Sequence, residues 1–271
     1  MRILSLITLV LLCAFVLSGC LEVQTTINVK RDGSGTVREL VIIKSDMLRM
    51  MMTVAKKMKN DDEDGKKNSE LFDEKELREK AETMGEGVAY KSGKKISTDD
   101  GDGYEAVYVF KDINTLRVDQ DPNIQPSSSS DEDDNKDKKE ITFEFRKGSP
   151  ATLIVHVPPT KRGMENEEET EEQEDEDTES GIEMARMMLK DLKISSVIEV
   201  QGTVVESDAT FREKSKITLM DIDFGELLED ENLIRKAMKR NDISDEEAKE
   251  LMKEYPGLKI ELNRTTTVRF R

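Results

Sequence analysis

Residues 21–44 read LEVQTTINVKRDGSGTVRELVIIK, and this stretch decides the kind of fold that the chain adopts. From Leu21 to Lys30 apolar or β-branched side chains alternate with polar ones, which is the pattern of a half-buried β-strand. The segment Arg31–Gly35 is rich in turn-forming residues, and Thr36–Lys44 is rich in β-branched ones. The stretch therefore predicts a β-hairpin.

The rest of the chain adds strands and helices around this hairpin. Further strands are expected at Tyr104–Phe110, Ile141–Arg146, Thr152–Val157, Ile194–Val205, Lys216–Met220 and Thr266–Phe270. Helices are expected at Asp46–Lys59, Asp73–Met84, Gly181–Leu192, Phe224–Leu228, Glu231–Lys239 and Asp245–Tyr255. In the last helix Ser244 and Glu247 form a capping box, and Pro256 and Gly257 end it. Strands that pair across long insertions indicate an α+β fold with a mainly antiparallel β-sheet, several helices and long acidic disordered insertions.

Three polar segments interrupt these elements: Asn60–Glu70, Pro126–Glu140 and Glu165–Glu179. The last is almost entirely acidic, and we expect it to be a disordered, solvated loop because its like charges repel one another. Calcium binding by this loop is the alternative. The segments divide the chain into a signal peptide (1–19), an N-terminal α+β region (20–164), an acidic linker (165–180) and a C-terminal α+β part (181–271). That last part belongs to the same body or forms a subdomain.

The N-terminus carries a targeting pattern. Residues Ile3–Leu17 are almost wholly apolar and follow Arg2, but the run is shorter than the roughly 20 residues that span a bilayer. It closes on Leu17–Cys20, which resembles the bacterial lipobox. In that motif a peptidase cuts between the residues equivalent to Gly19 and Cys20, after the cysteine thiol has received a diacylglycerol. An ordinary secretory signal with a chance cysteine is the alternative.

Acylation of Cys20 with palmitate or similar chains makes the mature protein a body tethered to a membrane, because two or more chains anchor stably. Cys13 leaves with the signal peptide, so we expect no disulfide in the mature protein. The expected location is the bacterial cell envelope, facing the periplasm or the cell surface. Outer-membrane sorting is favoured because Leu21, and not an aspartate, follows the cysteine.

Charge and composition exclude several function classes. The net charge of −17 repels nucleic acid, so none is expected as a partner. His156 is the only histidine, and it lies on a predicted strand, where a structural role is the commoner one. Without more histidines or cysteines we predict no catalytic residue, metal or cofactor, and no enzymatic activity.

Methionine is unusually frequent, with 14 residues and no tryptophan. Methionine adapts to varied apolar partners, so the methionines of two predicted helices are candidates for an apolar groove: Met47, Met51, Met184, Met187 and Met188. The alternatives are simple core filling and binding of a soft metal, although the metal reading lacks histidine or cysteine partners.

The cysteine followed by a strand, an Asp-Gly-Ser-Gly turn (Asp32–Gly35) and a second strand resembles the LppM-like lipoprotein domain family. Residues 197–224 are similar to the family's later hairpin, but Gln201 stands where relatives often have proline, and Met220 lies near a usual tryptophan. The resemblance implies an envelope-anchored α+β domain likened to lipid-binding proteins, with no catalytic residues. The leading hypothesis is therefore a non-enzymatic lipoprotein that binds a lipid or another apolar ligand. The rival is an assembly or scaffold lipoprotein that contacts an envelope protein through its acidic loops.

Overall fold

The computed structural model describes residues 21–45, 72–98, 101–120, 140–158, 183, 186, 189–234 and 244–271. Its elements, in chain order, are β1 (Leu21–Val29), β2 (Gly35–Lys44), α3 (Glu74–Thr83), β3 (Ala89–Ser97), β4 (Gly101–Phe110), the 3-10 helix η1 (Ile113–Thr115), β5 (Arg117–Asp119), β6 (Glu140–Arg146), β7 (Ala151–His156), β8 (Leu192–Val200), β9 (Val204–Ser207), β10 (Arg212–Glu213), β11 (Lys216–Asp223), α5 (Phe224–Leu227), α7 (Asp245–Glu254), β12 (Leu258–Ile260) and β13 (Thr265–Phe270).

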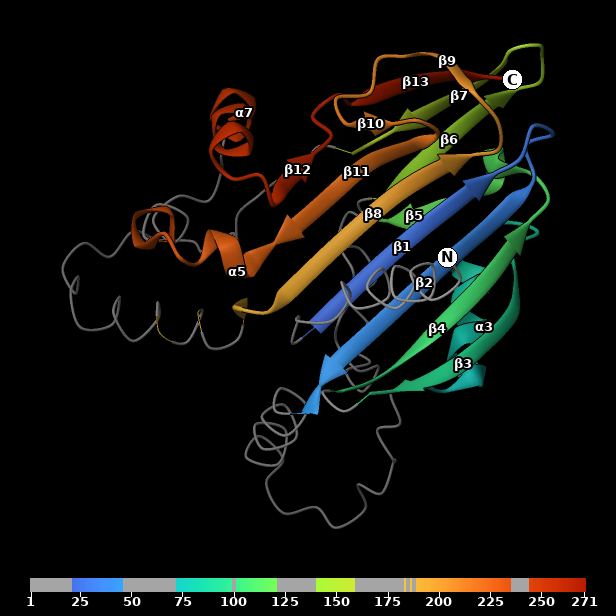
Figure 1. The fold of residues 1–271 in the computed structure, drawn as a ribbon. Helices are drawn as coiled ribbons and strands as arrows, with labels where there is room; N and C mark the ends of the chain where they lie inside the picture. Colours follow the sequence, from blue (N-terminus) through green and yellow to red (C-terminus); the bar gives the residue numbers. More distant parts are fainter. Residues whose placement is uncertain are drawn as a thin grey trace, which may run out of the picture.

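The larger sheet is built outward from the predicted hairpin. Its 8 described strands follow the order β10-β11-β8-β1-β2-β4-β3, and β12 pairs with β11 (Figure 1). Strands β1 and β2 are antiparallel neighbours, as the sequence predicts, and Gly33 in their turn has a φ of +86°, which glycine adopts at no steric cost. The other neighbour of β1 is β8, and this pair is parallel. A strand near the start of the chain therefore lies at the centre of the sheet.

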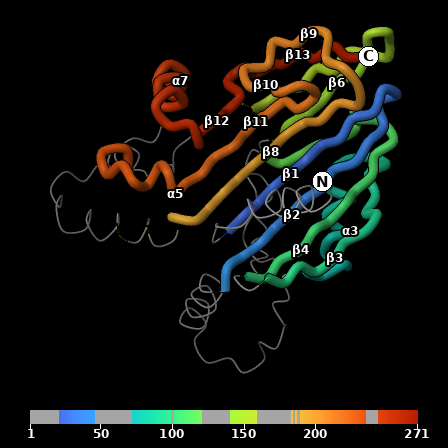
Figure 2. Tube along the Cα trace, in the orientation of Figure 1, coloured from blue at the N-terminus to red at the C-terminus, as the bar shows by residue number. Residues whose placement is uncertain are grey.

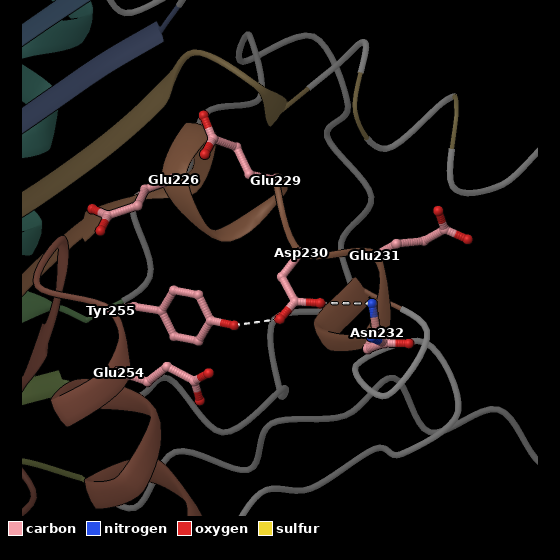
Figure 3. A pocket seen from close by; sticks show the side chains of 7 residues that line it. All are labelled: Glu226, Glu229, Asp230, Glu231, Asn232, Glu254 and Tyr255. Atoms are coloured by element: carbon pink, nitrogen blue, oxygen red, sulfur yellow. Dashed lines mark hydrogen bonds between the residues drawn. The ribbon is translucent and has the colours of Figure 1, made fainter.

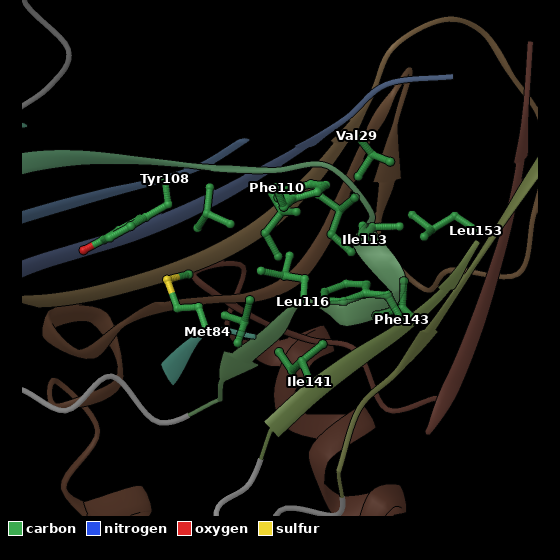
Figure 4. Close-up of a cluster of buried hydrophobic side chains, with 14 of the residues drawn as sticks. Val29, Met84, Tyr108, Phe110, Ile113, Leu116, Ile141, Phe143 and Leu153 are labelled. Atoms are coloured by element: carbon green, nitrogen blue, oxygen red, sulfur yellow. The ribbon is translucent and has the colours of Figure 1, made fainter. Parts of the chain in front are cut away.

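The smaller sheet covers part of one face of the larger one. It has 5 described strands in the order β5-β6-β7-β13-β9, all labelled in Figure 1. The side chains between the two sheets form a continuous hydrophobic cluster, here called the main core, to which α3 and η1 also contribute. Figure 4 shows part of it, with Tyr108 and Phe110 from the larger sheet and Phe143 and Leu153 from the smaller one.

Both sheets contain strands from either side of the acidic run 165–180. Strand β8 pairs with β1, and β13 pairs with β7. The predicted strand Ile194–Val205 is wrong as a single element, because β8 ends at Val200 and β9 begins at Val204 in the other sheet. Gly202 has a φ of +133° between them, so the chain leaves the larger sheet at this glycine.

The helices confirm several local predictions. Asp73 caps α3 by accepting a hydrogen bond from the Lys75 amide, and Ser244 and Glu247 form the expected capping box at α7. The predicted helix over 181–192 extends too far, because Leu192 is already the first residue of β8. The predicted helix over 46–59 and the acidic runs 60–70 and 165–179 lie outside the described residues.

The structure confirms the predicted fold class of an α+β protein with mainly antiparallel sheets and several helices. Among the described strands, the parallel β1–β8 pair is the exception to the antiparallel pattern. Within the part of the chain that the structure describes, no helix is long and apolar enough to cross a membrane.

Candidate functional site

The residues that the sequence singles out as sites mostly lie outside the described part of the chain. These are the cleavage and lipidation residues Gly19 and Cys20, and the groove candidates Met47, Met51, Met184, Met187 and Met188. The structure does place the neighbour of Cys20, because Leu21 is the first residue of β1. The candidate site therefore has to be built from the surroundings of Leu21.

A second apolar cluster surrounds Leu21 on the same face of the larger sheet as the main core. Its buried members are Leu21, Val23, Ile43 and Leu192, and the partly buried side chains that pack against them are Val41, Leu189, Ile194 and Phe224. The register explains the grouping, since Leu21 stands opposite both Ile43 and Leu192 on the neighbouring strands. We call this set of residues the Leu21 cluster. None of its members belongs to the smaller sheet.

A row of polar side chains separates the Leu21 cluster from the main core. Thr25 of β1 stands opposite Glu39 of β2 and Ser196 of β8, so the three share one face of the sheet. Glu39 is 8% exposed, and its carboxylate accepts a hydrogen bond of 2.8 Å from the Lys80 ammonium of α3. Burial lowers the pKa of Lys80, but the charge of Glu39 and this hydrogen bond outweigh it, so the pKa is raised overall. On β8, β1 and β2 this polar row lies between the two apolar clusters, whereas on β4 Ala106 of the main core stands opposite Glu39.

Polar contacts fix the end of the sheet at which β1 begins, which we call the Leu21 end. The Leu21 amide donates a 3.3 Å hydrogen bond to the Asp191 carbonyl, and the Asp191 carboxylate lies 3.7 Å from the Lys44 ammonium. Lys193 and Asp223 form a closer ion pair of 2.7 Å, and the hydrogen bond between them raises the pKa of Lys193. The first residue after Cys20 is thus held by the sheet and by its neighbours.

An acidic hollow lies between α5 and α7 (Figure 3). The residues that line it are Glu226, Glu229, Asp230, Glu231, Asn232, Glu254 and Tyr255. The Tyr255 hydroxyl donates a hydrogen bond of 2.5 Å to the Asp230 carboxylate, which raises the pKa of Tyr255 to about 12 and lowers that of Asp230. The excess of carboxylates suits a cationic partner and repels an anionic one.

His156 makes contacts across the smaller sheet. Its Nε2 lies 3.3 Å from Glu144 Oε1, and its Nδ1 lies 3.5 Å from Thr265 Oγ1. A hydroxyl, an imidazole and a carboxylate in a row have the composition of a catalytic triad, but the imidazole is 38% exposed on the surface of β7. Because such chemistry works in a site that excludes water, the arrangement fits cross-strand pairing better. Across the described residues, no group of histidine, cysteine and carboxylate side chains is arranged to hold a metal ion.

The sequence predicts only part of the Leu21 cluster. The alternation that predicts β1 already puts Leu21 and Val23 on its buried face. Their separation from the main core depends on Thr25 meeting Glu39 and Ser196, and hence on strand register. The acidic hollow joins residues of two helices that no motif connects.

Comparisons with known proteins add one distant similarity. No protein family and no curated protein matches the chain. Among solved structures, the chain is similar to the folded domain of the LppM protein of Mycobacterium tuberculosis, determined by NMR. The two share 10% sequence identity over 95% of this chain and 94% of that one, with a TM-score of 0.33. So low a TM-score supports no conclusion about a shared fold or function.

Proposed function

We propose that this protein is a lipid-anchored, non-enzymatic lipoprotein of the bacterial cell envelope, and that it holds an apolar ligand such as a lipid against the Leu21 cluster. The anchor is the acylated Cys20, and the outer membrane is the favoured location. The observation that carries the proposal is the position of this cluster. It lies on the inner face of the larger sheet, apart from the main core, and begins at the residue next to the anchor.

The cluster has the chemistry of a lipid site. Its side chains are aliphatic or aromatic, and burying such surface is worth about 25 cal/mol per Å². Apolar pockets of proteins commonly hold their ligands with a few polar groups at one edge. Here the polar row of Thr25, Glu39 and Ser196 supplies that edge.

Access to the cluster requires side chains to move. Its four central members are between 1% and 8% exposed, so a ligand reaches them by displacing what packs on them. Among the described residues, Leu189 and Phe224 are such side chains, and both are only half-buried. They are joined to the sheet by short connections next to β8 and β11.

The proposal is tested by measuring the binding of a fluorescent fatty acid to the chain that starts at Leu21. Val41→Thr adds a hydroxyl to a half-buried side chain of the Leu21 cluster while conserving its volume, so we expect binding to weaken about tenfold. The matched control is Val107→Thr, a half-buried valine of the same sheet that lies on the opposite face. This control is expected to bind the probe as the unmutated chain does.

Native mass spectrometry of the same samples reveals any lipid that co-purifies with the body. The proposal is wrong if the unmutated body carries no lipid and binds no probe. It is also wrong if both valine variants bind equally well while their melting temperatures stay the same.

A scaffold function is the second candidate, and the acidic hollow favours it. An envelope protein with a basic segment would contact Glu229 and Glu254, which are exposed. Binding of an oligolysine peptide, measured by calorimetry, should then weaken with added salt and with Glu229→Lys. Glu213→Lys on β10 is the control, because Glu213 is also exposed but lies outside the hollow. Equal weakening by both variants would show that the attraction comes from net charge alone.

A further inference from the structure

The chain leaves no spacer between the predicted anchor and the folded body. Leu21 directly follows Cys20 and is already paired with Ile43 on one side and Leu192 on the other. Its amide also donates to the Asp191 carbonyl. Many residues would be needed for a flexible tether, but here the residue next to the anchor belongs to a central strand. An acylated Cys20 therefore keeps the Leu21 end of the sheet at the bilayer.

The Leu21 end also has side chains that suit a membrane surface. Leu189, Phe224, Leu227 and Leu228 are half-buried there, on and beside α5, which lies next to the first residues of β8 in Figures 1 and 2. The exposed Lys190 precedes β8 at the same end. Apolar side chains beside a lysine fit the boundary between head groups and acyl chains, because a lysine stem is apolar and its ammonium stays in water. Glu226 and Glu229, which flank Leu227 and Leu228, belong to the acidic hollow, so this end suits head groups without net negative charge.

The faces of the sheet suit a membrane less well than its end does. The outer face of β1 presents the polar residues Gln24, Thr26 and Asn28, and Arg38 of β2 stands opposite Thr26. Two apolar side chains of the neighbouring strands on this face, Ile42 and Val197, are buried. Much of the inner face is covered by the smaller sheet and α3. A body lying flat would bring one of these polar or covered faces to the lipid.

From these observations we infer that the Leu21 end of the larger sheet docks on the lipid head groups, with the strands pointing away from the bilayer. The partner is the lipid surface itself, and the inference rests on the anchor in the function proposed above. Strand β1 has 9 residues, so the turn at its far end stands about 30 Å from the Leu21 end.

The experiment compares two exposed lysines at opposite ends of the strands. Lys190 lies beside the Leu21 end, and Lys30 follows the far end of β1. Each is replaced in turn by cysteine, Lys190→Cys and Lys30→Cys, in the full chain. Cys13 leaves with the signal peptide and Cys20 is acylated, so the new cysteine is the one free thiol to carry a fluorophore.

The labelled lipoproteins are reconstituted in phosphatidylcholine vesicles that contain a lipid with a head-group quencher. These vesicles carry no net charge, because anionic lipids would repel the acidic run 165–179 that precedes β8 in the sequence. We expect the fluorophore at position 190 to be quenched at least fivefold more strongly than the one at position 30. A water-soluble quencher, which should reach both labels, checks that neither is buried in protein.

Mass spectrometry of the same samples separates the two ways in which this inference fails. If the acyl mass is present and both labels are quenched equally, the body lies flat or tumbles, and the docking inference is wrong while the anchor stands. If the acyl mass is absent and neither label is quenched, the anchor itself is wrong, and the docking inference falls with it.

Discussion

The main core and the Leu21 cluster lie on the same face of the same sheet, yet they have different neighbours. Side chains of the main core are enclosed by the second sheet, α3 and η1, and several are not exposed at all, such as Leu153 and Val268. The Leu21 cluster lies beyond the polar row and has half-buried neighbours, among them Leu189 and Phe224. The difference shows that an apolar sheet face does not have to be a single core. One part of it is enclosed by a second sheet, and the other is bordered by half-buried side chains.

The largest effect is expected from truncating the main core. Leu153 of β7 is 0% exposed, so Leu153→Ala leaves a cavity that two sheets cannot close. We expect the free energy of unfolding to fall by about 4 kcal/mol. Equilibrium unfolding in urea measures it. A loss below about 1 kcal/mol would contradict the enclosed position of this side chain.

A leucine-to-alanine substitution in the Leu21 cluster should lower the free energy of unfolding by less. Leu192 is 6% exposed, and its described neighbours are partly exposed as well, so they relax more easily into the space that Leu192→Ala opens. We expect the free energy of unfolding to fall by about 2 kcal/mol, measured by the same urea unfolding. If both leucine variants lost equal stability, the Leu21 cluster would be an ordinary extension of the core and the comparison would fail.

A substitution at Gly202, where the chain passes from one sheet to the other, should reduce the stability by an intermediate amount. A Cβ at Gly202 would stand 2.5 Å from the Arg271 carbonyl oxygen, and the φ of +133° already disfavours alanine. Gly202→Ala should therefore destabilise the protein by about 2 kcal/mol in thermal or urea unfolding. Gly87→Ala is the control, since Gly87 also has a positive φ of +77° but nothing within 4 Å of its Cβ. Equal losses of stability would show that backbone strain, and not contact with Arg271, sets the cost.

The smallest effect on stability is expected from Lys80, which pairs with Glu39 of the polar row. The pKa of Lys80 is raised in the folded protein, so its contribution is complete below its ordinary pKa of 10.5 and is lost as the pH rises through the higher folded value. The Lys80 side chain is 45% exposed, which reduces the expected contribution to about 1 kcal/mol. The difference in unfolding free energy between the unmutated protein and Lys80→Met should shrink above about pH 10.5. A difference that stays constant across that range would mean that the ion pair contributes nothing.

Local patterns predicted much of this fold, whereas contacts between distant segments were harder to foresee. Alternation and turn composition predicted the hairpin of β1 and β2, and the capping box predicted the start of α7. Strand β3 was missed because it is an edge strand whose side chains are mostly exposed, so lysine and serine fill positions that would be apolar in a central strand. The apolar run across Gly202 looked like one strand because only the sheet pairing separates its two halves. The candidate site depends on the same kind of long-range pairing, since Leu21 and Leu192 come together only in the folded sheet.

The parallel pairing of β1 with β8 has a consequence for the order in which the chain folds. The hairpin of β1 and β2 joins neighbouring segments, so it forms early, while its pairing with β8 has to wait until residues 192–200 have been synthesised. Until then, one edge of a central strand has unpaired amide and carbonyl groups, and such an edge readily recruits other strands. A polypeptide cut short before residue 192 keeps that edge permanently open. Nascent or truncated copies of this protein are therefore the species that most need a chaperone.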